Sequence, residues 1–141
     1  MKRAFTLVEI MVVILIVSIL AALSVPNILR SRVAANEGAA IANLKTLSTA
    51  CQAYHIDQQV YPESLEMLST ANPPYIDNVL GAGSKQGYNF IYGSSDSDHF
   101  TINTNPAHTG LLKGRYFYLD ESGSIRTRSD QPAGPEDEII A

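Results

Sequence analysis

An uninterrupted apolar stretch near the start of the chain constrains its fold more than any other feature. The stretch runs from Phe5 to Val25 and contains a single charged residue, Glu9. As an α-helix, its roughly 21 residues would extend about 32 Å, which matches the hydrocarbon thickness of a bilayer. The rest of the chain must be polar, because the mean hydropathy is only +0.01. We therefore expect a membrane-spanning helix that is joined to a soluble head.

The main alternative for this stretch is a secretory signal peptide, which has a shorter apolar core and a cleavage site of small residues. Ala21 and Ala22 loosely imitate such a site. Apolar residues nevertheless continue to Val25 and lead into a helical pattern, which favours an anchor. Because Lys2 and Arg3 precede the stretch, the positive-inside rule predicts a cytoplasmic N-terminus.

Glu9 needs an explanation because it is the only charged residue between Arg3 and Arg30. A carboxylate inside a bilayer costs on the order of 3 kcal/mol on insertion scales. One interpretation is that Glu9 lies close enough to the cytoplasmic interface to reach water. The other is that its carboxylate has a partner or a function within the membrane.

The residues at the start of the apolar stretch form a dense pattern. A basic leader and a small residue, Ala4, precede the segment FTLVE (residues 5–9) and the aliphatic helix. This pattern resembles the class III signal of type IV pilins and type II secretion pseudopilins. In that family a membrane aspartyl peptidase cuts before the Phe and methylates the new amino terminus. The resemblance implies cleavage between Ala4 and Phe5, N-methylation of Phe5, and assembly roles for Phe5, Glu9 and Pro26.

Two positions depart from the family pattern. Ala4 stands where members nearly always have Gly, and Ser18 stands where many true pilins have Gly. Because Ala is the smallest replacement for Gly, we expect processing to survive, and the sequence leaves open whether it is slower. Pro26 removes one backbone hydrogen-bond donor from the helix and disfavours the helical conformation of the residue before it.

The implied function of Glu9 has a physical basis. Cleavage would expose a cationic amino group on Phe5 at nearly the depth of the Glu9 carboxylate of an incoming subunit. In a low dielectric, pairing these groups would relieve two desolvated charges, whereas mispairing would leave one charge buried alone. The pair would therefore set the axial register between subunits.

After Pro26 the apolar residues recur every three or four positions, which is typical of an amphipathic helix. This spacing predicts one helix from about Phe5 to about Gln58. Cys51, the only cysteine, is interpreted as part of the apolar face of this helix and not as a reactive thiol. The apolar positions are Val33, Ala40, Leu44, Leu47, Cys51 and Tyr54.

The remainder of the chain reads as a small α+β head. A turn and a short helix are expected within 61–68, and a flexible connection within 81–87. Alternating apolar residues then predict strands, of which the last two form a hairpin through 120–123, and residues 129–141 read as a flexible tail. The fold class we expect is α+β, a long N-terminal helix packed by a small antiparallel sheet. The predicted strands are 88–92, 99–105, 115–119 and 124–127.

Four acidic residues in predicted loops could supply oxygen ligands to calcium, namely Asp96, Asp98, Asp120 and Glu121. The resemblance to major pseudopilins, which have a calcium site in their C-terminal region, implies such a site here. The spacing is not that of an EF-hand, and acids flanked by Gly and Ser also mark ordinary turns. Calcium is therefore a candidate ligand here, and we expect no other cofactor.

Other functional classes find little support in the sequence. The formal net charge of −4 argues against binding of nucleic acids, which normally requires a basic face. His55, His99 and His108 lack the spacing of a zinc site. Neither a phosphate-binding Gly-rich loop nor an ordered Ser/His/Asp set is present, so we expect a protein that is not an enzyme.

These observations predict a structural subunit of a pilus-like or pseudopilus filament. Residues 1–4 would be the prepilin leader, 5–26 the transmembrane and assembly helix, 27–128 the head, and 129–141 the tail. The expected partners are other copies of the chain, the prepilin peptidase, and an inner-membrane assembly platform with its ATPase. The protein would cross the bacterial inner membrane once and later form a periplasmic or cell-surface filament.

The alternative is a membrane-anchored enzyme or binding domain with a single span that does not polymerise. Glu9 discriminates between the two, because a plain anchor has no need of a carboxylate. The sequence does not distinguish a surface pilus from a secretion pseudopilus or a DNA-uptake fibre.

Overall fold

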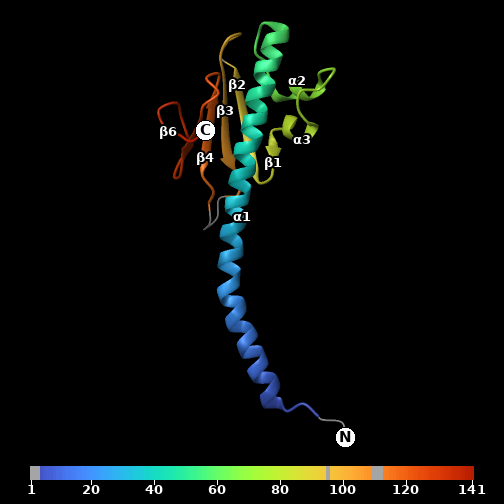
Figure 1. The fold of residues 1–141 in the computed structure, drawn as a ribbon, viewed down its shortest axis with the longest axis vertical. Coiled ribbons are helices and arrows are strands. Elements are labelled where there is room, and N and C mark those ends of the chain that lie inside the picture. Colours follow the sequence, from blue (N-terminus) through green and yellow to red (C-terminus); the bar gives the residue numbers. More distant parts are fainter. Residues whose placement is uncertain (1–3, 95, 109–112) are drawn as a thin grey trace.

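One helix, α1 (Leu7–Gln58), runs along the whole length of the molecule (Figure 1). The structure is a computed structural model that describes residues 4–94, 96–108 and 113–141. The lower part of α1 stands alone, and all other elements surround its upper part (Figure 1). This arrangement confirms the single long helix that the apolar stretch and the later periodicity predict.

Both ends of α1 have recognisable caps. The Thr6 hydroxyl accepts a hydrogen bond of 3.2 Å from the Glu9 amide, which satisfies one free donor of the first turn. Gln59 adopts the left-handed conformation (φ 62°), and its amide donates to the His55 carbonyl. Between these caps the helix continues through Pro26, although proline removes one hydrogen bond from the ladder.

The head contains an antiparallel sheet of six strands that follow one another in chain order. The four predicted strands correspond to β2 through β5. Two short helices, α2 (Leu65–Thr70) and α3 (Asn78–Gly81), lie on the side of β1 (Figure 1). The strands are β1 (Ser84–Lys85), β2 (Tyr88–Ser94), β3 (Phe100–Pro106), β4 (Tyr116–Asp120), β5 (Ile125–Arg128) and β6 (Glu138–Ile139).

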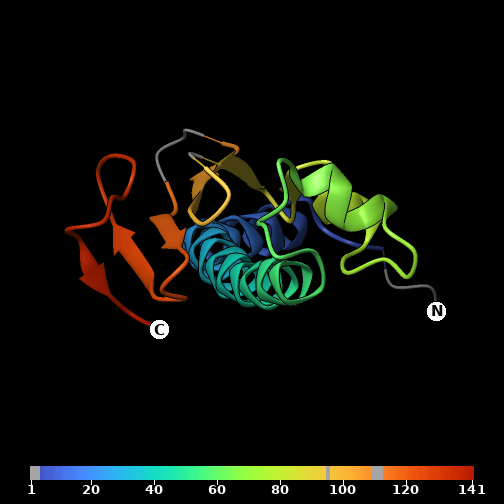
Figure 2. The same cartoon turned by 90° about the horizontal axis from the view of Figure 1, so that it is seen from above.

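The core lies between one face of this sheet and the upper part of α1. The predicted alternation holds, because Phe90 in β2 and Phe100 and Ile102 in β3 point inward and are buried. Seen along α1, the sheet and α2 cover one side of the helix and leave the opposite side open (Figure 2). The helix contributes Ala40, Leu44, Leu47, Ala50 and Cys51 to the core.

The connection between α2 and β2 is more regular than the sequence predicts. The Asp77 carboxylate accepts a hydrogen bond of 2.8 Å from the Leu80 amide and caps α3. A Cβ atom at Gly81 would lie 2.3 Å from the Ser69 hydroxyl, so the absence of a side chain lets α3 approach α2. The segment 81–87, which the sequence predicts to be a flexible connection, contains the end of α3 and strand β1.

The C-terminal segment, which the sequence predicts to be a flexible tail, forms β6 and pairs with β5. Asp137 organises it: one carboxylate oxygen lies 3.3 Å from Arg128 and the other accepts from the Gly134 amide at 2.8 Å. Ala133 packs with Tyr116 and Tyr118 on the outer face of the sheet. These contacts connect the segment to the head, and its mobility stays a prediction.

Candidate functional site

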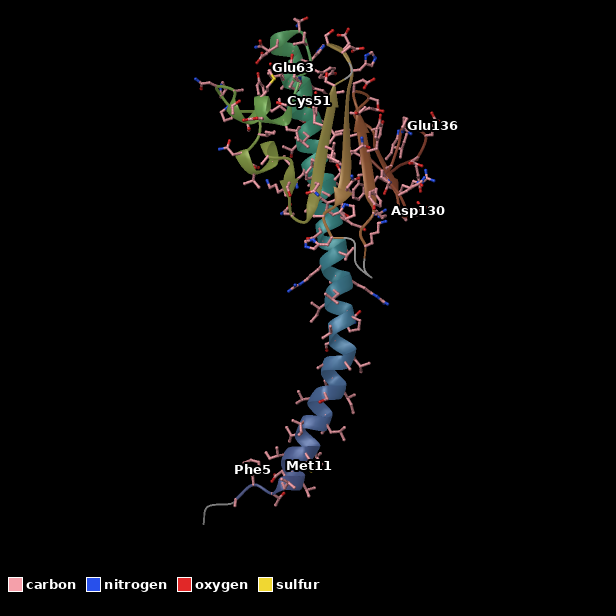
Figure 3. All side chains as sticks on the ribbon, turned by 180° about the vertical axis from the view of Figure 1, so that it is seen from behind. Phe5, Met11, Cys51, Glu63, Asp130 and Glu136 are labelled. Atoms are coloured by element: carbon pink, nitrogen blue, oxygen red, sulfur yellow. The ribbon has the colours of Figure 1, made fainter. Side chains whose placement is uncertain are left out.

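The predicted processing site lies just before the first turn of α1. Ala4 and Phe5 are exposed and precede the helical residues, so the peptide bond between them is accessible and outside the helix. Phe5 lies at the end of the molecule farthest from the head (Figure 3). The predicted leader residues Lys2 and Arg3 lie outside the described residues. Cleavage and methylation themselves remain predictions.

Glu9 lies in the first turn of α1, where a carboxylate favourably opposes the positive end of the helix dipole. Among residues 4–94, 96–108 and 113–141, its carboxylate has no hydrogen-bonding or ionic partner. Its amide is bound to the Thr6 hydroxyl, so the capping bond does not use the acidic group. The carboxylate is therefore available to a group outside this chain.

The apolar part of α1 is not covered by any other described segment of the chain. The helix is long and apolar enough to cross a membrane, and the residues of its apolar window are not buried. Phe5 is 75% exposed and Leu7 79%, whereas Phe100 and Leu44 in the core of the head are fully buried. A contiguous apolar surface of this size on a protein marks contact with lipid or with another protein. The structure thus places Glu9 at one end of an unpartnered apolar helix.

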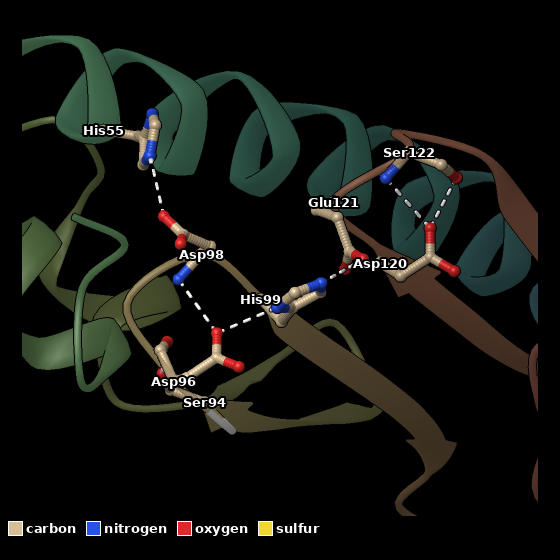
Figure 4. Close-up of polar contacts among 8 residues, drawn as sticks. All are labelled: His55, Ser94, Asp96, Asp98, His99, Asp120, Glu121 and Ser122. Carbon is tan, nitrogen blue, oxygen red and sulfur yellow. Dashed lines mark hydrogen bonds and ion pairs between the residues drawn. The ribbon is translucent and has the colours of Figure 1, made fainter. Parts of the chain in front are cut away.

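A second candidate site lies at the far end of the head, where two loops meet the end of α1 (Figure 4). Asp96 accepts hydrogen bonds from the Asp98 amide at 2.9 Å and from the His99 ring at 2.8 Å. The other ring nitrogen of His99 lies 3.8 Å from Glu121, in the turn after β4. His55 on α1 lies 3.9 Å from Asp98. Histidines thus connect three elements that are distant in the sequence.

These contacts shift the ionisation of the groups involved. The hydrogen bond from His99 lowers the pKa of the Asp96 carboxyl below its usual range, and the Asp98 amide adds to the effect. The same hydrogen bond, together with the charge on Asp96, raises the pKa of His99. The sequence indicated no role for His99, although an aspartate three positions earlier was a local signal for this pair.

The four predicted calcium ligands are only partly brought together. Asp96, Asp98 and Glu121 converge on the two histidines, whereas the Asp120 carboxylate accepts hydrogen bonds from Ser122 within its own turn (Figure 4). Within the part of the chain that the structure describes, there is no group of three or more His, Cys, Asp or Glu residues arranged to hold a metal ion. Calcium binding stays a prediction.

The structure confirms the interpretation of Cys51 as a core residue. Its side chain is fully buried, and burial raises the pKa of its thiol to about 12. A thiol with so high a pKa is protonated at neutral pH and is a poor nucleophile. No functional role is assigned to it.

An ion pair that the sequence did not indicate joins α1 to the sheet. The Glu37 carboxylate accepts hydrogen bonds from the Arg115 amide at 2.9 Å and from its guanidinium Nε at 3.0 Å. The Arg115 carbonyl in turn accepts a bond of 3.0 Å from the Tyr88 hydroxyl. These bonds hold the start of β4 against the helix at the base of the head.

An apolar helix that is long enough to cross a membrane, joined to an α+β head with an antiparallel sheet, defines a pilin-like protein. The prokaryotic N-terminal methylation motif matches residues 1–25. The chain is therefore similar to type IV pilins and type II secretion pseudopilins in both its N-terminal motif and its fold.

Similar proteins come from both branches of this family. Type II secretion system core protein G of Escherichia coli is 35% identical over 88 residues, which are 62% of this chain and 61% of that protein. The protein of the same name from Vibrio cholerae is 41% identical over 72 residues, 49% of each chain. Type IV major pilin protein PilA of Myxococcus xanthus is 36% identical over 62 residues, 44% of this chain and 28% of that protein. Each match spans less than two thirds of the relative's length.

Proposed function

We propose that this protein is a filament subunit. It enters the inner membrane as a prepilin, is cut between Ala4 and Phe5, is methylated on Phe5, and polymerises with other copies into a helical filament. The observation that carries the proposal is the uncovered apolar half of α1, which begins directly at the methylation motif. In the membrane, lipid covers this surface, and in the filament the helices of other subunits replace the lipid.

Glu9 supports polymerisation over simple anchoring. Its carboxylate has no partner among the described residues of its own chain, and it lies four positions after the amino group that cleavage would create. An anchor without Glu9 would insert more easily, by on the order of 3 kcal/mol. A carboxylate at this position is useful if it receives the Phe5 ammonium of a neighbouring subunit.

The relatives favour a role in type II secretion over a surface pilus. Several of them are named type II secretion system core protein G, and one is named a type IV major pilin. We therefore place the subunit in a secretion pseudopilus. Its partners would be other copies of itself, the prepilin peptidase, and the assembly platform with its ATPase. Its N-terminus would face the cytoplasm, and its head the periplasm.

Mass spectrometry of the mature protein, combined with imaging of sheared filaments, tests this proposal. The expected mass corresponds to a chain that starts at Phe5 and carries one methyl group, and the same chain should be the main component of the filaments. An intact Met1 or a cut after Ala22 would exclude prepilin processing. A processed protein that never enters filaments would favour the membrane-anchored domain that does not polymerise.

A further inference from the structure

Two arginines mark the end of the apolar half of α1. Arg30 and Arg32 are the first charged residues after Glu9, and both are exposed. From Glu9 to Arg30 an α-helix rises about 32 Å, close to the roughly 30 Å of a bilayer's hydrocarbon core. With Glu9 just inside one face of the hydrocarbon layer, the two arginines therefore reach the lipid headgroups at the other face.

Neither arginine is neutralised by its own head. Among the ion pairs of the described residues, none includes Arg30 or Arg32. The next acidic residue along α1 is Glu37, and both of its carboxylate oxygens already accept hydrogen bonds from Arg115. The two guanidinium groups are therefore available to a ligand that does not belong to this chain.

The directions of the two side chains indicate what kind of ligand fits. Residues two positions apart on an α-helix point about 160° away from each other. Arg30 and Arg32 thus extend to opposite sides of the stem, and a second protein packed along one side could contact only one of them. A layer of lipid phosphates surrounds the helix and can contact both. Long arginine side chains also reach from the apolar boundary toward the headgroups.

We propose that Arg30 and Arg32 bind the phosphates of anionic phospholipids in the leaflet on the head side of the membrane. This contact holds α1 at a fixed depth and the head at a fixed height above the bilayer. A guanidinium presents two parallel N–H donors that match phosphate oxygens. The inference rests on the membrane anchoring in the proposed function, but not on polymerisation.

The test measures the lipids that contact the unassembled full-length subunit in vesicles. Electron paramagnetic resonance reports the fraction of spin-labelled phosphatidylglycerol or phosphatidylcholine that the protein immobilises. We expect phosphatidylglycerol to be preferred by up to about fivefold per arginine at low salt, and less at high salt. The double variant R30Q/R32Q should bind both lipids almost equally.

Lys45→Gln is the matched control, because Lys45 is another exposed basic residue of α1 and lies about 22 Å farther along the helix. It should leave the lipid preference unchanged. Equal lipid preference in the wild type and R30Q/R32Q would overturn the proposal, and so would an equal loss in Lys45→Gln. If R30Q/R32Q keeps the preference but loses filaments, the arginines contact another subunit instead. If the wild type immobilises neither lipid, the anchoring itself is refuted.

Discussion

Thr6 caps the first turn of α1, in which Glu9 lies, and the hydrogen bond between them sets where the helix starts. After the proposed cleavage, the ammonium group of Phe5 would lie immediately outside this turn. There it would face the positive end of the helix dipole, which is unfavourable for a cation. The ammonium therefore gains from a carboxylate partner, which the proposed assembly supplies as Glu9 of a neighbouring subunit.

His99 is the residue with the clearest prediction for pH. Its hydrogen bond to Asp96 raises its pKa above the usual 6.5, and Asp96 favours the protonated ring. The contribution of the His99–Asp96 pair to the stability of the folded head is therefore fully present below pH 6.5. It is lost as the pH rises through the higher pKa that His99 has in the folded state. An NMR titration of the His99 ring should show the raised pKa. Asp96→Asn should bring the pKa back toward 6.5, whereas Asp120→Asn should have little effect.

A second prediction at the scale of residues concerns calcium binding at the two loops. If the carboxylates of Asp96, Asp98, Asp120 and Glu121 take up the ion, calcium should raise the melting temperature of the head by mass action. Differential scanning calorimetry in millimolar calcium, compared with chelator, measures this change. Asp98→Asn should reduce the shift. Identical melting temperatures in both buffers would exclude the site.

At the scale of elements, periodicity explains which parts the sequence could predict. The spacing of apolar residues predicted α1, and the alternation in 88–92 and 99–105 predicted β2 and β3 with the correct inward faces. Strands β1 and β6 have two residues each, which is too short for any period, and they exist because a neighbouring strand pairs with them. Their local sequence, rich in turn formers and acids, carries no strand signal.

In the candidate sites, too, only features that are local in the sequence could be predicted. The methylation motif is local in sequence, so a cleavage position and a role for Glu9 could be predicted without a structure, and both stay predictions. The bond between Glu37 and Arg115 joins residues 78 positions apart, and no local pattern reveals such a pair. Similarly, the convergence of His99 and Glu121 depends on the pairing of β3 with β4.

Glu37→Gln tests how strongly this ion pair joins the helix to the sheet. Gln keeps the size of the side chain, but only one of its two terminal atoms accepts a hydrogen bond, so one bond to Arg115 is lost and the other loses the carboxylate charge. We expect the free energy of unfolding of the head to fall by about 1–2 kcal/mol. Chemical denaturation followed by circular dichroism measures this loss. Glu66→Gln, an exposed acid in α2, is the control, and an equal effect of both variants would contradict a special role for Glu37.

At the scale of the whole molecule, α1 divides into two halves that differ in what covers them. The upper half is covered by the chain's own sheet, so the head has a core of its own. The lower half has no cover from the residues that the structure describes. Changes near Glu9 should therefore alter assembly and leave the head intact, because the first buried core residue, Ala40, lies about 46 Å farther along the helix.

Glu9→Ala should accordingly block filament formation while the processed subunit accumulates in the inner membrane. The variant inserts more easily by on the order of 3 kcal/mol. However, the Phe5 ammonium of a neighbour would then be buried without a partner, at a cost of several kcal/mol. Quantifying the membrane-bound subunit and the sheared filaments separately measures both effects. A normal filament yield would show that Glu9 does not set the register.

The uncovered half of α1 also has a consequence for the order of events in the proposed filament. Burying one Leu, Ile or Val side chain stabilises a protein by about 1.5–3 kcal/mol, so exposing this half to water would cost tens of kcal/mol. A subunit can therefore move only directly from lipid to the helices of its neighbours. Growth is then confined to the end of the filament at the membrane, and subunits cannot be exchanged along its length. The order of subunits from the tip of a filament to its base would therefore be the order in which they left the bilayer.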